Sequence, residues 1–153
     1  MAQLTEQIIQ FLQKQSFTVV TTIDKEGFPH NSCKGIVEID PEGKIYLLDL
    51  YHGHTSENLK ENKHISLTAV NEHTFKGYSL KGKARLVSKE DLTEDVMAAW
   101  DKKINKRITK RIMKNVTGKS GHPNHPEARL PEPKYMIVME VGKIVDLTPQ
   151  HLK

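Results

Sequence analysis

The chain has 153 residues, of which 37% are hydrophobic and 27% are charged, and its formal net charge is +4. This length fits one compact domain and leaves little room for a second core, so we expect residues 1–153 to form a single domain. The composition argues against wholesale disorder, and no apolar run approaches the roughly 20 residues that cross a bilayer. The opening residues MAQLTEQ do not follow a secretory signal pattern, and we therefore expect a cytoplasmic protein.

Cys33 is the single cysteine of the sequence. An internal disulfide and a thiolate cluster for zinc or iron are therefore excluded. The small excess of basic residues permits anionic partners, but nucleic-acid binding is better indicated by a basic stripe with interleaved aromatic residues. We expect neither nucleic acid nor a membrane as a partner.

The first third of the chain reads as one helix followed by three strands. Residues 4–14 repeat apolar side chains at helical spacing, and Thr5 suits the N-cap position. From Phe17 the composition becomes rich in β-branched residues, and the turn sequences DKEG and DPEG separate three extended runs. Because each connection has the length of a hairpin, an antiparallel meander is predicted. The three runs are residues 17–24, 28–40 and 44–50.

A short helix and two further strands are predicted in the middle of the chain. The polar sequence YHGHTSENLKEN indicates a loop leading into a helix whose N-cap is Thr55. Residues 64–70 and 75–87 read as strands, and Gly77 and Gly82 indicate a bulge, a bend or a close backbone approach in the second of them.

The last third is predicted to hold a long helix, a loop and a sixth strand. Ser88 begins the helix, whose apolar residues recur at every fourth position, so a bend or break is expected near its middle. Residues 117–134 are rich in Gly and Pro and indicate a long loop before the strand at 135–147. The apolar helix positions are Leu92, Val96, Trp100, Ile104, Ile108, Ile112 and Val116.

Six strands linked mostly by tight turns predict a mainly β fold, in which an antiparallel barrel or sandwich has helices packed outside it. The sequence contains no G-x-G-x-x-G pattern and no P-loop. Dinucleotide-binding and nucleotide-hydrolysing α/β folds are therefore disfavoured.

The segment GHTSENLKEN offers a candidate phosphate site. A helix that begins at Thr55 points free backbone N–H groups and the positive end of its dipole at the preceding loop. Thr55 and Ser56 add hydroxyl groups, and His54 adds a positive charge when protonated. The alternative interpretation is an ordinary capped helix between two strands.

Four segments, taken in order, resemble the FMN-binding split-barrel superfamily, which is also called pyridoxamine 5'-phosphate oxidase-like. The segments are IDKEGFPHNSCKGIVEID, KIYLLDL, HTSENLKENKHISL and FKGYSLKGKARLV. The resemblance covers residues 17–87, with a looser match at the last strand. It implies a homodimer of six-stranded antiparallel split β-barrels with peripheral helices, and one FMN in each of two clefts between the subunits.

The same resemblance implies which residues contact the cofactor. His54 and Thr55 match the phosphate-binding pair, and Asn58 matches a polar position of the helix. His54 stands where the family usually has Lys or Arg, so less fixed positive charge is expected. The strand positions that match contacts with the ribityl chain and the flavin ring are Asn31, Ser32, Cys33, Lys34, Leu48, Asp49 and Gly77.

Two of these residues have roles that can be weighed physically. A cation at Lys34 near the N1–C2 edge of the ring stabilises the negative charge of reduced flavin, whereas the alternative is a solvated lysine on a strand. Cys33 is either a reactive thiol beside the ring or a small buried hydrophobic side chain.

The histidines suggest a metal site, and the basic residues of the long helix suggest a surface for anionic partners. His52, His54, His122 and His125 lack the carboxylate or cysteine spacing of a metal site, and no metal is expected. The basic residues within 102–114 form either a solvated face, a surface for RNA or anionic lipid, or an electrostatic cover of the cleft. With no aromatic residue among them, stacking on bases is unsupported.

These observations favour an FMN-dependent oxidoreductase that passes a hydride or electrons to a small acceptor of unknown identity. The alternative is a non-catalytic carrier or sensor of flavin, haem or deazaflavin. Pyridoxamine 5'-phosphate oxidases carry a substrate-binding Arg-Leu-x-Pro at the C-terminus, whereas Arg129-Leu130-Pro131 precedes the last strand here. Oxidation of vitamin B6 is therefore not expected, and no catalytic residue is assigned.

Overall fold

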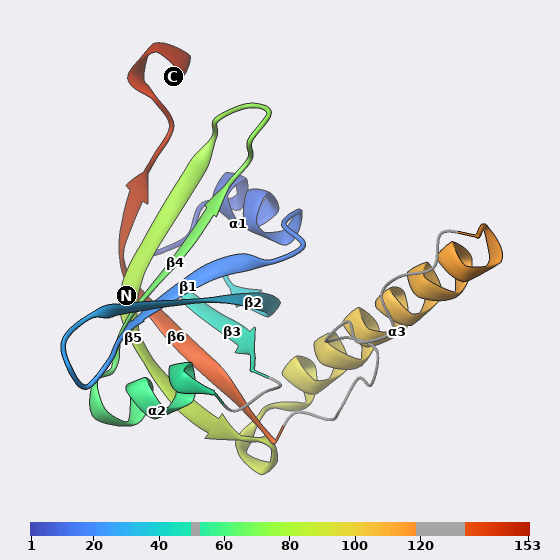
Figure 1. The fold of residues 1–153 in the computed structure, drawn as a ribbon, viewed down its shortest axis with the longest axis horizontal. Coiled ribbons are helices and arrows are strands. Elements are labelled where there is room, and N and C mark those ends of the chain that lie inside the picture. Colours follow the sequence, from blue (N-terminus) through green and yellow to red (C-terminus); the bar gives the residue numbers. More distant parts are fainter. Residues whose placement is uncertain (50–52, 119–133) are drawn as a thin grey trace.

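The computed structural model describes residues 1–49, 53–118 and 134–153. The six strands form a closed antiparallel barrel in the order β1-β2-β3-β6-β5-β4, with three α-helices outside it (Figure 1). The predicted fold class, mainly β with flanking α, is confirmed. The strands are β1 (Thr18–Ile23), β2 (Pro29–Asp40), β3 (Lys44–Leu48), β4 (His64–Val70), β5 (Gly77–Ser88) and β6 (Tyr135–Asp146). The helices are α1 (Glu6–Gln13), α2 (His54–Glu61) and α3 (Glu94–Val116), with short 3-10 turns at Lys89–Asp91 and Gln150–Leu152.

The predicted meander of β1, β2 and β3 is confirmed, and its two turns use glycine for a local reason. Gly27 and Gly43 have φ angles of +87° and +102°, which side chains rarely adopt. A Cβ at Gly43 would also overlap with the carbonyl oxygen of Ala2. β1 then pairs with β4 on its other side, and this pairing closes the barrel.

Alternating residues of the strands fill the barrel. In β1 every second side chain is buried, beginning with Thr18, as the pleat of a strand requires. Thr5 caps α1 as predicted, since its hydroxyl accepts a hydrogen bond from the N–H of Ile8 at 3.4 Å. α1 packs its buried side chains into the same core. The fully buried side chains include Leu12, Val20, Ile45, Leu47, Leu67, Leu80 and Met139.

The irregularity predicted in the fifth strand is a close backbone approach at Gly82, beside a bulge whose extra residue, Gly142, belongs to β6. The register between β5 and β6 shifts between Lys81 and Gly82. A Cβ at Gly82 would overlap with the carbonyl oxygen of Glu140, so the two backbones approach each other more closely there than any side chain allows. The glycine is therefore required by the bulge.

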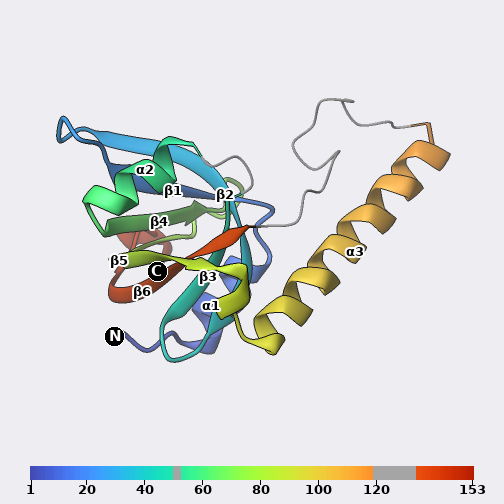
Figure 2. The same cartoon turned by 90° about the horizontal axis from the view of Figure 1, so that it is seen from below.

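The predicted bend of the long helix is wrong, because α3 is uninterrupted from Glu94 to Val116. The break lies earlier, between the 3-10 turn and α3. A four-residue repeat is longer than the ideal helical period of about 3.6 residues, so the apolar stripe winds around a straight helix. Only its first part packs on the barrel, where Val96 and Trp100 are buried, and the remainder extends away from the strands (Figures 1 and 2).

Within the described ranges, no helix has both the length and the apolar character needed to cross a membrane.

Candidate functional site

The N-terminus of α2 is where the predicted phosphate site falls, and its geometry differs from the prediction in one respect. The N-cap is Gly53 rather than Thr55, and it makes no side-chain capping bond. Thr55 cannot cap the helix because it is buried and its hydroxyl lies 2.8 Å from the hydroxyl of Ser32. A Cβ at Gly53 would meet no atom within 4 Å, so the space beside the N-cap is open.

Buried polar contacts fix α2 to the strands beneath it. The Ser32–Thr55 contact joins the helix to β2, and the Asn58 side-chain amide donates to Thr22 Oγ1 of β1 at 3.0 Å. Such bonds satisfy groups that would otherwise be costly to bury. They hold the first turn of α2 at a defined position against the barrel.

A chain of three polar side chains lies next to this helix. Lys34 Nζ donates to Asp49 Oδ1 at 2.6 Å, and Tyr135 Oη donates to Asp49 Oδ2 at 2.6 Å. Asp49 has no exposed surface and the Lys34 side chain is only 11% exposed. The interpretation of Lys34 as a solvated lysine is therefore wrong, and the ion pair is largely removed from water.

Tyr135 is held in its protonated form by this arrangement. Burial raises the pKa of the Tyr135 phenol well above its usual range, and the hydrogen bond to the Asp49 carboxylate raises it further. A contact with Ser56 acts in the opposite direction, but it is outweighed. The phenol is therefore a hydrogen-bond donor at neutral pH.

The pleat of β2 separates the four candidate residues on that strand into two groups. Ser32 and Lys34 pair with inward-facing residues of β1 and point toward α2 and Asp49. Asn31 and Cys33 lie on the opposite face and are exposed. The interpretation of Cys33 as a buried hydrophobic side chain is therefore wrong.

Two further candidate residues lie apart from this cluster. Leu48 is buried in a small core with Trp100 and Met136, and its side chain serves packing beneath α3. Gly77 pairs with Val70 where the β4–β5 hairpin turns, at the opposite end of the barrel from α2 (Figure 1). Within one chain, the structure does not bring Gly77 together with the other candidates.

A half-buried histidine, His30, and an exposed one, His54, border the first turn of α2. The rings of His30 and His54 meet edge to face, with their centroids 5.4 Å apart. His54 Nδ1 also lies 3.5 Å from Glu57 Oε2, although both side chains are largely exposed. An anion bound at this helix end would therefore compete with a carboxylate for the imidazole.

Three residues of the site, Tyr135, Thr22 and His30, were not predicted from the sequence, and Ser56 was predicted only as a hydroxyl donor. A signal for Tyr135 existed, because Asp49 follows the apolar run IYLL and a buried carboxylate needs donors. Nothing in the sequence identified Tyr135 as the donor. A hollow of about 330 Å³ borders the cluster and is lined by Ser56, Glu57, Lys60, Leu86, Ser88 and Tyr135.

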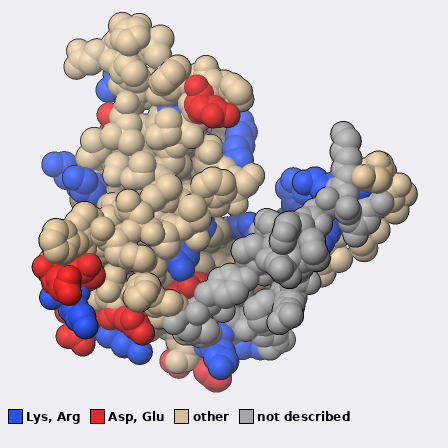
Figure 3. All heavy atoms as spheres, in the orientation of Figure 1, with Lys and Arg blue, Asp and Glu red and all other residues tan. Residues whose placement is uncertain are grey.

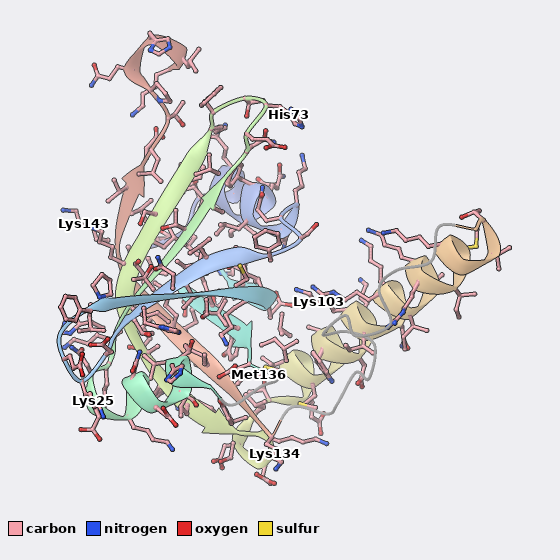
Figure 4. The ribbon with its side chains drawn as sticks, viewed as in Figure 1. Lys25, His73, Lys103, Lys134, Met136 and Lys143 are labelled. Atoms are coloured by element: carbon pink, nitrogen blue, oxygen red, sulfur yellow. The ribbon has the colours of Figure 1, made fainter. Side chains whose placement is uncertain are left out.

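Part of the basic face of α3 turns toward the barrel. A Cβ at Gly35 of β2 would lie 3.3 Å from Arg107 Nη2 and 3.6 Å from Lys103 Nζ. Lys103 points from α3 toward the strands in Figure 4, and Figure 3 shows basic side chains gathered along the visible part of the helix. These two cations therefore lie over the strand that holds Lys34.

For the residues that the structure describes, no group of three His, Cys, Asp or Glu side chains is placed to hold a metal ion. His52, His122 and His125 lie outside the described residues. The segment Arg129–Pro131 and most of the predicted 117–134 loop lie outside them as well.

A closed six-stranded barrel with a polar cluster at the start of α2 defines the split-barrel class of proteins. The chain belongs to the pyridoxamine 5'-phosphate oxidase family, since the family model described as pyridoxamine 5'-phosphate oxidase matches residues 4–140. The resemblance to the FMN-binding split-barrel superfamily is thereby confirmed. Among proteins with curated descriptions, none matches this chain.

Solved structures show the same fold at low sequence identity. HupZ from Group A Streptococcus is 18% identical, with a TM-score of 0.63 and 95% of each chain covered. HutZ from Vibrio cholerae, described as a haem storage protein, is 17% identical, with a TM-score of 0.56 and 95% of each chain covered. A Clostridium acetobutylicum protein related to general stress protein 26 is 16% identical, with a TM-score of 0.53 and 95% of this chain and 94% of that chain covered.

Proposed function

We propose that this protein binds FMN and acts as an FMN-dependent oxidoreductase whose acceptor is a small molecule. Membership of the pyridoxamine 5'-phosphate oxidase family supports the choice of cofactor. The observation that carries the proposal is the convergence of the Ser32–Thr55 pair and the Lys34–Asp49–Tyr135 chain at the open N-terminus of α2.

The residues at this helix end suit a phosphate. The N-cap makes no side-chain bond to the first turn, and Ser56 N and Glu57 N already donate to Gly53 O, so the N–H groups of His54 and Thr55 are the ones left for a phosphate. Thr55 and Ser32 supply hydroxyl groups, and His54 supplies a positive charge when it is protonated. Lys34 is already paired with Asp49, so it adds little net charge toward the phosphate.

The same pairing gives Lys34 a defined orientation beside the proposed flavin. When bound, FMN supplies the exchange of a hydride or of single electrons, and the protein supplies binding, orientation and electrostatics. The Asp49 carboxylate accepts hydrogen bonds from both Lys34 and Tyr135, and it thereby fixes the position of the Lys34 ammonium group. The basic groups of Lys103 and Arg107 over Gly35 add positive potential on the same strand. We assign no general acid or base.

The proposal includes a homodimer with the cofactor between subunits, and a location in the cytoplasm. Gly77 and the outward-facing Asn31 and Cys33 lie away from the α2 cluster, so within one chain they cannot all contact one flavin. Contact with a cofactor held by a second copy accounts for their positions. This part of the proposal follows from the family resemblance.

The visible spectrum of the purified protein tests the cofactor. Bound flavin absorbs at about 450 nm and bound haem at about 400 nm. Reconstitution with FMN should give a flavin band that stays with the protein during gel filtration. Turnover of NADH or NADPH with an artificial acceptor, well above that of free FMN, then separates an enzyme from a flavin carrier. A protein that retains no flavin after reconstitution would contradict the proposal.

Thr55→Ala is expected to weaken FMN binding by about 1–2 kcal/mol, or roughly tenfold, because one charge-assisted hydrogen bond is lost. His54→Lys is expected to strengthen binding and to reduce its dependence on pH, because a lysine keeps its charge above pH 7. Fluorescence titration of FMN measures both effects. Thr109→Ala, an exposed change on α3, is the matched control. If both variants bind FMN as the wild type does, the phosphate has been placed at the wrong turn.

Haem is the second candidate, and the pair of His30 and His54 rings favours it. Imidazole is a common axial ligand of haem iron, and the similar HutZ structure is described as that of a haem storage protein. Haemin titration of the wild type and of His54→Ala distinguishes a haem site from an FMN site. A haem band in the wild type that this variant loses would favour haem over FMN.

A further inference from the structure

The outer surface of the barrel carries a groove of about 560 Å³ on the strands that flank the bulge between β5 and β6. None of the residues lining it belongs to the cluster at α2. Its lining combines three lysines, one glutamate, hydroxyl groups and the backbone of two glycines with the apolar residues Met1, Ile23, Ile65 and Val141. The residues used below are His64, Ser66, Lys81, Lys83, Gly82 and Lys143.

Basic residues occupy directly paired positions across these strands, and one of these pairs joins two lysines. Lys81 of β5 is paired with Lys143 of β6, and Lys83 of β5 is paired with His64 of β4. Figure 4 shows Lys143 pointing away from the barrel. Like charges directly opposite each other in a sheet are destabilising, so the fold gains nothing from this arrangement.

Among the residues that the structure describes, no carboxylate forms an ion pair with these lysines. Glu140 lines the groove and is paired in register with Lys83. Even so, the ion pairs found among residues 1–49, 53–118 and 134–153 do not include Lys81, Lys83 or Lys143. The groove therefore has a net positive charge and open lysine side chains.

The bulge gives the groove its floor. Gly82 has no room for a side chain, and the nearest atom that a Cβ at the exposed Gly142 would meet is Lys81 O at 3.7 Å. Because Gly142 is exposed and has no side chain, a ligand can lie close to the backbone of β6 beside Lys143. Ser66, paired with Lys81, adds a hydroxyl group at the same level.

We propose that this groove binds a small phosphate-bearing molecule, with adjacent phosphates lying between Lys81 and Lys143 and within reach of Lys83. Ammonium groups on flexible stems bind phosphate as point charges, and hydroxyl and backbone N–H groups complete such sites. The volume lies in the range of pockets for small ligands. The repulsion between the paired lysines is relieved when an anion binds.

Inorganic pyrophosphate is the probe, used with the full-length purified protein at low salt in isothermal titration calorimetry. The double variant Lys81→Gln/Lys143→Gln is expected to bind pyrophosphate at least about tenfold more weakly than the wild type, since two charge-assisted contacts are lost. Lys14→Gln/Lys25→Gln removes the same charge from exposed positions outside the groove and is the matched control. Wild-type binding should weaken as salt is raised.

Thermal melting without pyrophosphate shows whether the double variant folds. Its melting temperature at low salt should equal or exceed that of the wild type, because a like-charge pair has been removed. The proposal is overturned if the wild type does not bind pyrophosphate, or if the double variant binds it equally well. An equal loss in the control variant would show a general effect of charge and would also overturn it.

Thr55→Ala separates this site from the one at α2. Pyrophosphate affinity should survive this change, whereas FMN affinity should fall. If Thr55→Ala abolishes pyrophosphate binding and the lysine variant retains it, the anion sits at α2 and the groove proposal fails alone. Pyrophosphate binding that depends on the lysines, in a protein that does not bind FMN, would overturn the proposed function and leave the groove intact.

Discussion

Asp49 lies with no exposed surface between Lys34 and Tyr135, and both neighbours donate hydrogen bonds to its carboxylate. A buried ion pair gains little over water when it is complete, because the two charges have been desolvated. Breaking it is different, since the remaining charge keeps its desolvation cost without its partner. The stability of this region therefore depends on all three side chains being present.

Asp49→Asn is expected to lower the free energy of unfolding by about 3–5 kcal/mol, because it leaves the Lys34 ammonium buried without a counter-charge. Urea denaturation measures the change. Glu61→Gln, an exposed position on α2, should change the free energy by less than about 0.5 kcal/mol. Equal effects of the two substitutions would show that Asp49 and Lys34 do not form a buried pair in solution.

Tyr135 gives the protein a dependence on alkaline pH. Its pKa is raised in the folded protein, so its contribution to stability is complete below the unfolded value of about 10 and is lost as pH rises through the folded value. Wild-type stability should therefore fall more steeply than that of Tyr135→Phe above about pH 10. Urea denaturation of both proteins from neutral to alkaline pH tests this. Parallel curves would contradict it.

At the scale of elements, local patterns predicted the strands and the pairing of the first three, while contacts between distant segments were not predictable. Turn sequences with glycine and runs of β-branched residues identified the β1–β3 meander. The hydrogen bond from Tyr135 to Asp49 joins residues 86 positions apart, and no local pattern encodes it. The N-cap of α2 was predicted at Thr55, whose hydroxyl suits capping, but the helix begins earlier, at Gly53, and the Thr55 hydroxyl contacts Ser32 instead.

The β2 strand shows the same limit for the candidate site. A run of four residues was expected beside one ligand, but alternate side chains of a strand point to opposite faces. Ser32 and Lys34 therefore join the α2 cluster, whereas Asn31 and Cys33 face outward. The residue types were informative, and the register needed to sort them came from strand pairing.

Gly82, where β5 lies against the bulged strand β6, is the position whose substitution should be most costly for the sheet. Gly82→Ala is expected to destabilise the protein by about 3 kcal/mol, because its Cβ would overlap with the backbone of Glu140. Gly53→Ala, where a Cβ meets no atom within 4 Å, should cost less than about 1 kcal/mol. Thermal and urea unfolding of the two variants provide the comparison. Similar losses would show that the bulge relaxes to accept a side chain.

At the scale of the whole molecule, large apolar side chains remain on the surface of a single chain. Val116 of α3 is 77% exposed, and Phe17, Phe28 and Phe75 are each more than half exposed. Apolar side chains that lie singly on a surface are common in monomers, whereas a contiguous patch marks a site of association. The proposed homodimer therefore follows from the family resemblance, and a pattern read along one chain does not identify which surfaces meet.

Analytical ultracentrifugation at micromolar concentration is expected to give twice the mass of one chain. If the cofactor lies between subunits, FMN should also strengthen the dimer, because a ligand that binds only the assembled form stabilises it. A monomer that binds FMN with unchanged mass would contradict this arrangement. The lysine variants of the groove should keep the dimeric mass.

The closure of the barrel between β1 and β4 limits how copies of this protein can meet. Each of the six strands is hydrogen-bonded to a neighbour on both sides, although some are paired over only part of their length: β2 pairs with β1 at residues 29–34 and with β3 at residues 35–40. The strand segments without a neighbour are therefore short, and short edges offer little template for the edge-to-edge pairing that leads to fibrils. Assembly is then expected to proceed mainly through side chains, whose shape and charge can discriminate between partners.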